Sequence, residues 1–139
     1  TDGSEFAQKG VDHGLSLAKA LGSKITIITV TEPFPIPMGA AAWVIGNNDI
    51  ARYSADCRKA AEGLLVPIKA TAEKMGIVTD TVHVPDARPA TAILETAQRA
   101  ICNLIVMASH GRRGVERLLL GSQAAEVVTS SKVPVLIVP

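Results

Sequence analysis

The sequence predicts one domain of the α/β class, built on a doubly wound parallel sheet, and three observations support this class. Apolar runs and helical patterns alternate strictly along the 139 residues, which is typical of parallel strands joined by right-handed helical crossovers. Apolar residues make up 47% of the chain and aromatic residues only 3%, so aliphatic side chains must fill the core, as they do in parallel sheets. A chain of this length buries roughly two-thirds of its unfolded surface, and we expect residues 1–139 to form a single domain.

The first predicted element is a helix that follows the N-cap residue Ser4 and ends at Leu21, where Gly22 is the stop signal. Small and apolar residues recur along it at steps of three and four, at Ala7, Val11, Gly14, Ala18 and Leu21. Gly10 and Gly14 weaken a helix intrinsically, so we expect this narrow face to lie unusually close to a sheet.

The next stretch contains a strand, a loop and a long helix. Residues 25–30 form a short β-branched run, which is typical of a buried strand. Prolines exclude helix and central strand from residues 32–39. A helical pattern then covers residues 49–75 and is closed by Gly76, and Pro67 within it predicts a kink or a break.

The second half continues the alternation and ends in a strand. Residues 79–84 alternate apolar and polar side chains, which indicates a strand closer to the edge of the sheet. The helix expected over residues 90–100 should turn Ile93, Ala97 and Ile101 inward. The remaining elements are a buried strand, a helix and a final strand, expected over residues 104–107, 122–130 and 133–138.

The most informative segment is residues 107–122. A short apolar strand runs into a loop that contains Gly111 and Gly114, and Gly121 and Ser122 then open a helix, with Ser122 as its expected cap. Such a transition presents unpaired backbone N–H groups to an anion, and glycine allows a positive φ and a close approach of phosphate. The segment also carries three arginines, Arg112, Arg113 and Arg117. It predicts a phosphate site contacted by Gly111, Gly121 and Ser122; the alternative is that the glycines serve only a tight turn.

The motif resembles that of a known family. The chain reads Ala-Ser-His-Gly from Ala108, then nine further residues, then Gly121-Ser122. This order is similar to the nucleotide loop of the universal stress proteins, which reads Gly-x-x-Gly-x9-Gly-Ser/Thr. The segments at residues 1–4, 25–30 and 133–138 match the family in order and spacing, so the resemblance covers essentially the whole chain. Ala108 departs from the family's glycine. Its methyl lies where the ribose would approach, and a positive φ there would cost about 1 kcal/mol.

The resemblance implies a flavodoxin- or Rossmann-like sheet of five parallel strands in the order 3-2-1-4-5. In that order the first strand would precede Thr1, and we expect it to be missing from this chain. Ligands of such sheets bind at the carboxyl ends of the strands, where the strand order reverses. That point would bring Asp2 beside the glycine loop.

The resemblance further implies that the site holds ATP, ADP or AMP, with Mg²⁺ bound by phosphate oxygens and the Ser122 hydroxyl. Thr1 and Asp2 would take the adenine and ribose end, and the backbone of Val30 would contact the adenine edge. The residues expected to contact the nucleotide are Thr1, Asp2, Val30, Met107, Ala108, Ser109, His110, Gly111, Arg112, Gly121, Ser122 and Gln123. From the residues alone, Asp2 has the alternative of a helix cap, Val30 of a core valine and His110 of a surface-loop histidine.

The acidic residues argue against a dedicated hydrolase. Nucleotide hydrolysis needs a positioned base and usually a metal held by carboxylates, and neither Asp2 nor Asp86 has an acidic partner at short spacing in the loop. We therefore expect no catalytic residue and at most slow ATP hydrolysis. The chain also lacks Gly-x4-Gly-Lys-Ser/Thr and Gly-x-Gly-x-x-Gly, which removes support for the large NTPase and dinucleotide-binding classes.

Charge and composition exclude further classes. The formal net charge of +1 is too small for a general nucleic-acid or membrane-surface protein, and no apolar run approaches the ~20 residues of a membrane span. Cys57 and Cys102 lack metal-ligand spacing and are interpreted as reduced thiols of a cytoplasmic protein.

The final strand predicts an interface. Its residues are apolar and would lie at the sheet edge in the family's order: Val133, Pro134, Val135, Leu136, Ile137 and Val138. Antiparallel pairing with a second copy would bury both edges, so we expect a homodimer. The leading interpretation is an ATP-binding stress-response regulator read by an unknown protein partner. The alternatives are a dimeric interaction module without nucleotide, favoured by Ala108, and a weak ATPase.

Overall fold

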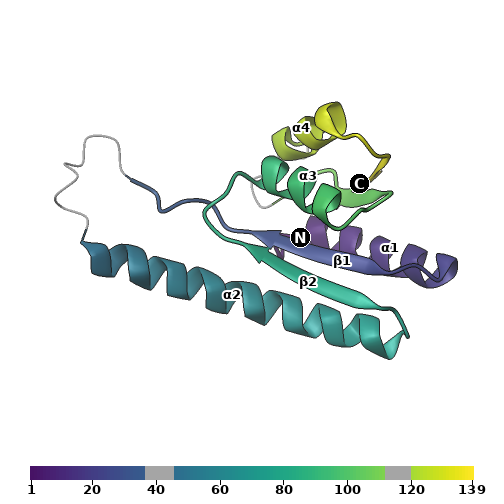
Figure 1. Cartoon of the computed structure of the whole chain (residues 1–139), viewed down its shortest axis with the longest axis horizontal. Coiled ribbons are helices and arrows are strands. Elements are labelled where there is room, and N and C mark those ends of the chain that lie inside the picture. Colours follow the sequence, from purple (N-terminus) through teal and green to yellow (C-terminus); the bar gives the residue numbers. More distant parts are fainter. Residues whose placement is uncertain (37–45, 112–119) are drawn as a thin grey trace.

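Helices and strands alternate along the chain in the computed structural model, which describes residues 1–36, 46–111 and 120–139. Figure 1 shows the arrangement of these elements. In chain order they are α1 (Glu5–Leu21), β1 (Ile25–Val30), α2 (Asn47–Lys74), β2 (Thr79–Val84), α3 (Pro89–Arg99), β3 (Ile105–Ala108), α4 (Ser122–Ser130) and β4 (Val135–Val138). The predicted alternation is thereby confirmed, with boundaries that differ by one or two residues, as is usual at element ends.

All strand pairing in the described residues is parallel. β1 pairs with β2, from Ile25 opposite Thr79 to Val30 opposite Val84. β3 pairs with β4, from Ile105 opposite Val135 onward. The described strands thus form two sheets of two strands each, so the α/β class with parallel strands is confirmed, while the single five-stranded sheet stays a prediction.

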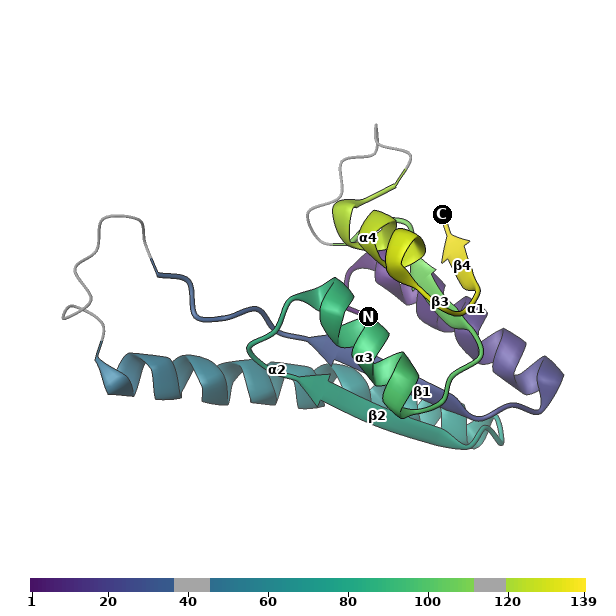
Figure 2. The ribbon, with the colours of Figure 1, turned by 45° about the horizontal axis from the view of Figure 1, so that its top comes forward.

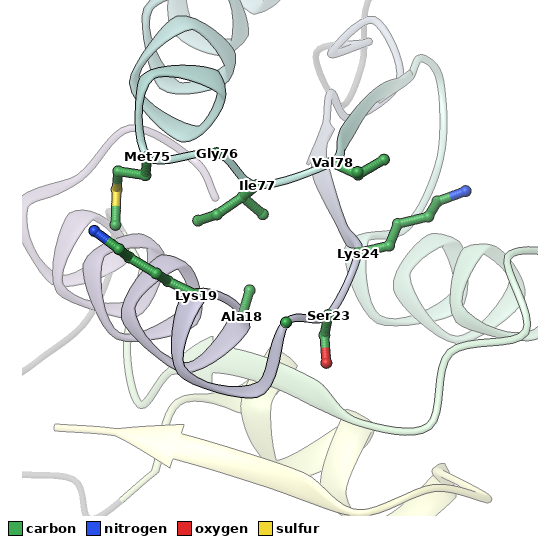
Figure 3. A pocket seen from close by; sticks show the side chains of 9 residues that line it. Ala18, Lys19, Ser23, Lys24, Met75, Gly76, Ile77 and Val78 are labelled. Atoms are coloured by element: carbon green, nitrogen blue, oxygen red, sulfur yellow. The ribbon is translucent and has the colours of Figure 1, made fainter.

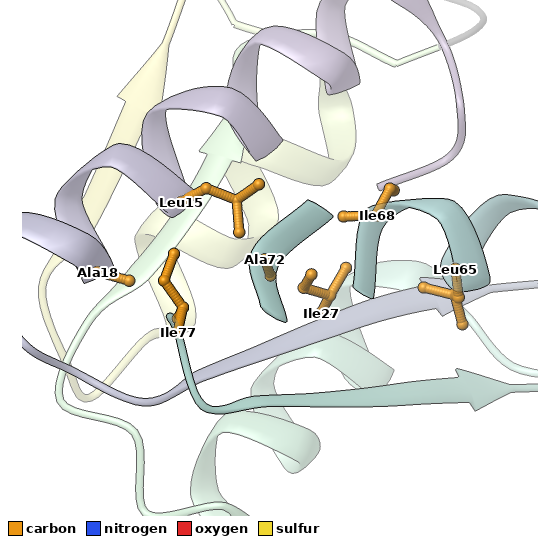
Figure 4. Close-up of a cluster of buried hydrophobic side chains, with 7 residues drawn as sticks. All are labelled: Leu15, Ala18, Ile27, Leu65, Ile68, Ala72 and Ile77. Atoms are coloured by element: carbon orange, nitrogen blue, oxygen red, sulfur yellow. The ribbon is translucent and has the colours of Figure 1, made fainter. Parts of the chain in front are cut away.

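Two apolar cores lie on opposite faces of the strands. The first joins α1 and α2 to β1 through Leu15, Ala18, Ile27, Leu65, Ile68, Ala72 and Ile77 (Figure 4). The second joins α3, β3 and α4 through the buried Ala90, Ile105 and Val127. Figure 2 shows α3 and α4 on one side of the strands and α1 and α2 on the other. Helices cover both faces, which is the doubly wound arrangement.

Helix α1 bridges the two sheets by a close backbone approach. A Cβ on Gly14 would lie 3.6 Å from Ile25 Cδ1 in β1 and 3.9 Å from Val106 Cβ in β3. A Cβ on Gly10 would lie 3.0 Å from the backbone nitrogen of Ala108. The prediction that the glycines of this helix serve close packing is confirmed for Gly10, where a Cβ would press on the backbone of β3, whereas a Cβ on Gly14 would make only ordinary van der Waals contacts.

Three helix-to-strand turns repeat one backbone motif. Gly22, Gly76 and Ile101 each adopt a left-handed conformation, with φ of 60°, 78° and 53°. In each turn the next N–H donates to a carbonyl five residues back: Ser23 to Ala18 (2.9 Å), Ile77 to Ala72 (3.0 Å) and Cys102 to Ala97 (2.8 Å). This is the Schellman motif, in which glycine is the favoured residue. The prediction that Ile101 turns inward is wrong, since it lies beyond the helix end and is 89% exposed.

Two other sequence predictions need correction. Leu21, the last residue of α1 before the C-cap Gly22, is 66% exposed rather than packed on the sheet. Helix α2 runs through Pro67 without a break, whereas a kink at this residue stays a prediction. Leu65 and Ile68, the residues that flank this turn, are buried in the first core, and tertiary packing of this kind sustains a helix against a local defect.

Helix α2 extends well beyond the strands at its N-terminal end (Figure 1). An aromatic contact ties this end to the segment that follows β1, since the rings of Phe34 and Tyr53 meet edge to face with centroids 5.2 Å apart. The Tyr53 hydroxyl also donates to the Glu32 carbonyl at 3.1 Å. Although α2 is long, no helix in the described part of the chain is apolar enough over a sufficient length to cross a membrane.

Candidate functional site

The carboxyl ends of β1 and β3 face a common region that also receives the first residues of the chain. The Thr1 amino nitrogen donates to the Ile28 carbonyl of β1 at 2.7 Å. Val30 ends β1 in a half-buried position opposite Val84, and its contact with adenine stays a prediction.

Asp2 lies directly against the loop that follows β3. Its Oδ2 is 2.6 Å from the place that a Cβ on Gly111 would take, so the predicted position of Asp2 beside the glycine loop is confirmed. Its Oδ1 accepts a hydrogen bond from the Ser4 N–H at 2.9 Å. The cap of α1 is Ser4 itself, whose Oγ accepts from the Ala7 N–H at 3.2 Å. The alternative in which Asp2 caps the helix is therefore wrong.

The loop glycines are explained by space and not by backbone conformation. Neither Gly111 nor Gly121 has a positive φ. A Cβ on Gly111 would overlap Asp2, and one on Gly121 would lie 3.1 Å from the Ser109 carbonyl oxygen. Ala108 ends β3 with a negative φ as well, so the strain expected for an alanine in the left-handed region does not arise.

The N-terminus of α4 meets the same loop. Gly121 is the N-cap, and its own N–H donates to the Ser109 carbonyl at 2.8 Å. The expectation that Ser122 caps this helix is wrong by one position, since Ser122 is the first helical residue and the N-cap, Gly121, has no side chain that could form a cap. The first N–H groups of a helix have no partner within it and carry a partial positive charge. This end of α4 is therefore suited to an anion.

The N-termini of α3 and α4 are tied together by two side chains. Gln123 Oε1 accepts from the Ala90 N–H at 3.0 Å and so caps α3. Arg88 reaches both carboxylate oxygens of Glu126 at 3.2 Å. Because the Gln123 side chain is engaged in this way, a nucleotide contact from Gln123 would come from its backbone. The pattern of the sequence gave no sign of this link.

His110 is enclosed at the start of the loop. Its Nδ1 lies 3.0 Å from Ser109 Oγ, and its ring is 6.0 Å from that of Phe6. Its Nε2 is buried, without a hydrogen-bond partner among the described residues. His110 thus lies in the loop with its side chain partly buried, and its contact with a nucleotide stays a prediction. Phe6 was missed as a wall of the site, although it is one of only two phenylalanines and lies in the first turn of α1.

Several predicted residues need separate mention. Met107 is half-buried and packs against the second core. Arg112, Arg113, Gly114 and Arg117 lie outside the described residues, and their contacts stay predictions.

No group of three His, Cys, Asp or Glu side chains in the described ranges could hold a metal ion, so phosphate oxygens would have to supply most ligands of a bound Mg²⁺.

A hollow lies where α1 and α2 end, before β1 and β2 begin, and Figure 3 shows the side chains that line it. It has a volume of about 160 Å³ and is lined by Ala18, Lys19, Gly22, Ser23, Lys24, Met75, Gly76, Ile77 and Val78. Helices α1 and α2 both end there, and helix C-termini carry a partial negative charge that disfavours phosphate. Lys24 is held by Asp80 at 2.9 Å, and this ion pair raises the pKa of Lys24 and lowers that of Asp80. The hollow is smaller than the roughly 300 Å³ at which ligand pockets begin.

The fold is that of an α/β protein with parallel strands, and the N-terminus of α4 lies beside the loop that follows β3. The chain belongs to the universal stress protein family, whose sequence model matches residues 1–139. It is 30% identical to a universal stress protein of Methanocaldococcus jannaschii over 99% of this chain and 78% of that relative.

Two solved structures illustrate the similarity. Hypothetical protein MJ0577 superimposes with a TM-score of 0.82 at 23% identity, over 99% of this chain and 90% of that chain. A universal stress protein in complex with cAMP superimposes with a TM-score of 0.67 at 26% identity, over 100% of this chain and 91% of that chain. The first similarity concerns the fold alone, whereas the second also provides a relative with a bound adenine nucleotide.

Proposed function

We propose that this chain is a cytoplasmic ATP-binding homodimer that acts as a nucleotide-dependent regulator of a stress response. The phosphates lie at the N-terminus of α4 and on the loop after β3, where Gly111, Gly121 and Ser122 are. The adenosine end lies between Thr1–Asp2 and Val30. Mg²⁺ is held by phosphate oxygens and the Ser122 hydroxyl, and water fills the other positions.

One observation carries the proposal. The N-terminus of α4, whose N-cap is the glycine Gly121, faces the same loop that Asp2 touches at Gly111, at the carboxyl ends of β1 and β3. An anion site and a polar contact for a sugar or base are thus brought together where ligands of doubly wound sheets bind. The relative in complex with cAMP supports an adenine nucleotide as the occupant.

The non-binding interaction module remains the second candidate, because Ala108 puts a methyl group beside the expected ribose. The structure weakens this candidate, since Ala108 is an unstrained strand residue. A weak ATPase is the third candidate. Hydrolysis would need a positioned base and usually a metal held by carboxylates, and the loop sequence offers no pair of acids at short spacing.

We further propose that the two sheets belong to one five-stranded sheet of order 3-2-1-4-5. β1 and β3 each pair on one side only within the described residues, and α1 spans both of them through Gly14. A strand preceding Thr1 would pair with both free edges. The hydrogen bond from the Thr1 nitrogen to the Ile28 carbonyl would then belong to the ladder between that strand and β1.

The test combines ligand release with one charged substitution. Protein purified without added nucleotide is denatured, and the supernatant is compared with nucleotide standards on an anion-exchange column. Mg-ATP titrations then compare the wild type with Ser122→Glu, which favours the helix N-terminus but repels phosphate. Ser23→Glu introduces the same charge at the opposite end of the molecule and is the matched control.

We expect ATP or ADP in the supernatant, a loss of affinity of roughly tenfold or more in Ser122→Glu, and no loss in Ser23→Glu. An empty protein that shows no heat with Mg-ATP would favour the interaction module. Steady release of inorganic phosphate under saturating Mg-ATP would favour the ATPase.

A further inference from the structure

The start of α3 is held by acceptors from other elements. Arg88 is the N-cap of this helix, its side chain makes no capping hydrogen bond, and the first turn contains no acidic residue. The Ala90 N–H donates instead to Gln123 Oε1 of α4 at 3.0 Å. In the turn before the helix, the Ala87 N–H donates to the Thr31 carbonyl at 3.2 Å. Because the first N–H groups of a helix have no partner within it, these outside acceptors decide how firmly α3 begins.

Both acceptors lie next to residues of the proposed nucleotide site. Thr31 directly follows Val30, the proposed adenine contact, and Gln123 directly follows Ser122, a proposed phosphate contact. The start of α3 is therefore connected to both ends of that site. Gln123 can use its backbone N–H toward the phosphate while its side chain holds the Ala90 N–H.

The first residues of α4 are held less firmly than its middle. Val127 is fully buried in the second core, whereas Ser122 and Gln123 are exposed, and helix ends fray. The hydrogen bond from Ala90 to Gln123 needs the first turn of α4 to be helical, because only then is the Gln123 side chain in reach. The first turns of α3 and α4 are therefore expected to open and close together.

We propose that a nucleotide phosphate at the N-terminus of α4 orders the start of α3 through the Gln123 side chain. This inference rests on the proposed function. A phosphate that accepts from the first N–H groups of α4 keeps Gln123 helical, and Gln123 then keeps the Ala90 N–H bound. A ligand that binds only the closed form shifts both turns toward it.

This ordering reaches the surface of the protein. The turn before α3 and the first turn of the helix are exposed at Asp86, Arg88 and Thr91, and Figure 2 shows α3 beside α4 on the outside of the strands. Gln123 is thus a positioning residue that carries the nucleotide state from the phosphate end of the site to an exposed segment on the neighbouring helix.

A second link between the two helices provides the matched control. Arg88 Nη2 lies 3.2 Å from Glu126 Oε1, and the Arg88 side chain is 74% exposed. Ion pairs at such exposure contribute little, and Glu126 lies one turn beyond Ser122. Glu126→Gln removes this ion pair and leaves the hydrogen bond to Gln123 in place, whereas Gln123→Ala does the reverse.

Two backbone amides report on the two helix starts and keep their own acceptors in every variant. The Ala125 N–H donates to the Gly121 carbonyl at 2.9 Å and reports on α4. The Ala92 N–H donates to the Arg88 carbonyl at 3.0 Å and reports on α3. Hydrogen exchange of both amides is measured by NMR with and without Mg-ATP. Each protein is compared at the same multiple of its own Kd, which calorimetric titration provides.

At about a hundred times Kd, a ligand slows an opening that is incompatible with binding by up to about a hundredfold. We expect Mg-ATP to slow exchange at both Ala125 and Ala92 by about tenfold or more in the wild type and in Glu126→Gln. In Gln123→Ala, we expect the same slowing at Ala125 and none at Ala92.

The wild type alone already decides the central point. Unchanged exchange at Ala92 while Mg-ATP is bound would overturn the inference and leave the proposed function intact. Equal slowing at Ala92 in the wild type and in Gln123→Ala would do the same, because the side chain would then carry no coupling. A wild type that gives no heat with Mg-ATP and no change at either amide would overturn both the inference and the proposed function.

Discussion

Single glycines set the spacing between α1 and β3. Gly10 and Gly63 both lie within helices, yet the two positions differ completely in what surrounds them. A Cβ on Gly10 would meet the backbone of Ala108 and Met107 at 3.0 and 3.4 Å, whereas one on Gly63 would meet nothing within 4 Å. Backbone atoms of a strand cannot move aside as a flexible side chain can. The same substitution therefore has opposite consequences at the two positions.

We predict that Gly10→Ala lowers the free energy of unfolding by about 1–3 kcal/mol, the usual cost of overpacking. Gly63→Ala should raise it by about 0.5–1 kcal/mol, because alanine is the better helix former. Chemical denaturation of both variants measures the two values. If both variants raised the free energy of unfolding by the same amount, α1 would not approach β3 as closely as described.

At the scale of the elements, the three Schellman turns fix how the chain passes from helices α1, α2 and α3 into the strand that follows each of them. Two of the turns use glycine in the left-handed position, and the third uses Ile101. A left-handed conformation costs a side-chain-bearing residue about 1–2 kcal/mol, and the exposed Ile101 side chain recovers little of that by burial.

Ile101→Asn should therefore stabilise the protein by about 0.5–1 kcal/mol, since asparagine tolerates this conformation. A higher midpoint of thermal unfolding is the expected result. The control is Val78→Asn, because Val78 is similarly exposed but does not adopt a positive φ, and it should show no gain. A destabilised Ile101→Asn would mean that the isoleucine makes contacts in solution that its exposure does not reveal.

The start of α3 depends on a residue of another helix. Gln123→Ala removes the acceptor of the Ala90 N–H, and we predict a loss of about 1 kcal/mol, as for other helix caps. Gln123→Glu keeps an acceptor and should be nearly neutral in stability. Amide hydrogen exchange at the first turn of α3 should be faster in the alanine variant alone. If Gln123→Ala left both stability and exchange unchanged, the cap would have no energetic role.

At the scale of the whole molecule, the proposed dimer depends on β4. Leu136 is 41% exposed on this strand and Val128 is 43% exposed on α4, so each accepts lysine without loss of a buried side chain. A charge on an edge strand opposes strand pairing between molecules. We predict that Leu136→Lys is a monomer by light scattering and that Val128→Lys remains a dimer. A wild-type monomer at micromolar concentration would contradict the dimer altogether.

The sequence predicted the elements well, because hydrophobic periodicity and terminal signals act locally. Ser4 and Gly22 bound α1, and residues 79–84 and 122–130 coincide with β2 and α4. It predicted less well where distant contacts decide. Neighbours that are remote in the chain decide three features: whether Ile101 is buried, whether α2 continues through Pro67, and how Gln123 caps α3. For the same reason the place of Asp2 came from topology, whereas the buried Nε2 of His110 was visible only in the structure.

The most direct test of the site is an amide NMR titration of the full chain with Mg-ATP. The nucleotide should perturb backbone signals at the carboxyl ends of the strands, around Asp2, Ser109–Gly111 and Ser122, and should leave the hollow around Lys19 and Val78 unchanged. Perturbations confined to that hollow, or absent at millimolar Mg-ATP, would contradict the placement of the nucleotide between β1, β3 and the N-terminus of α4.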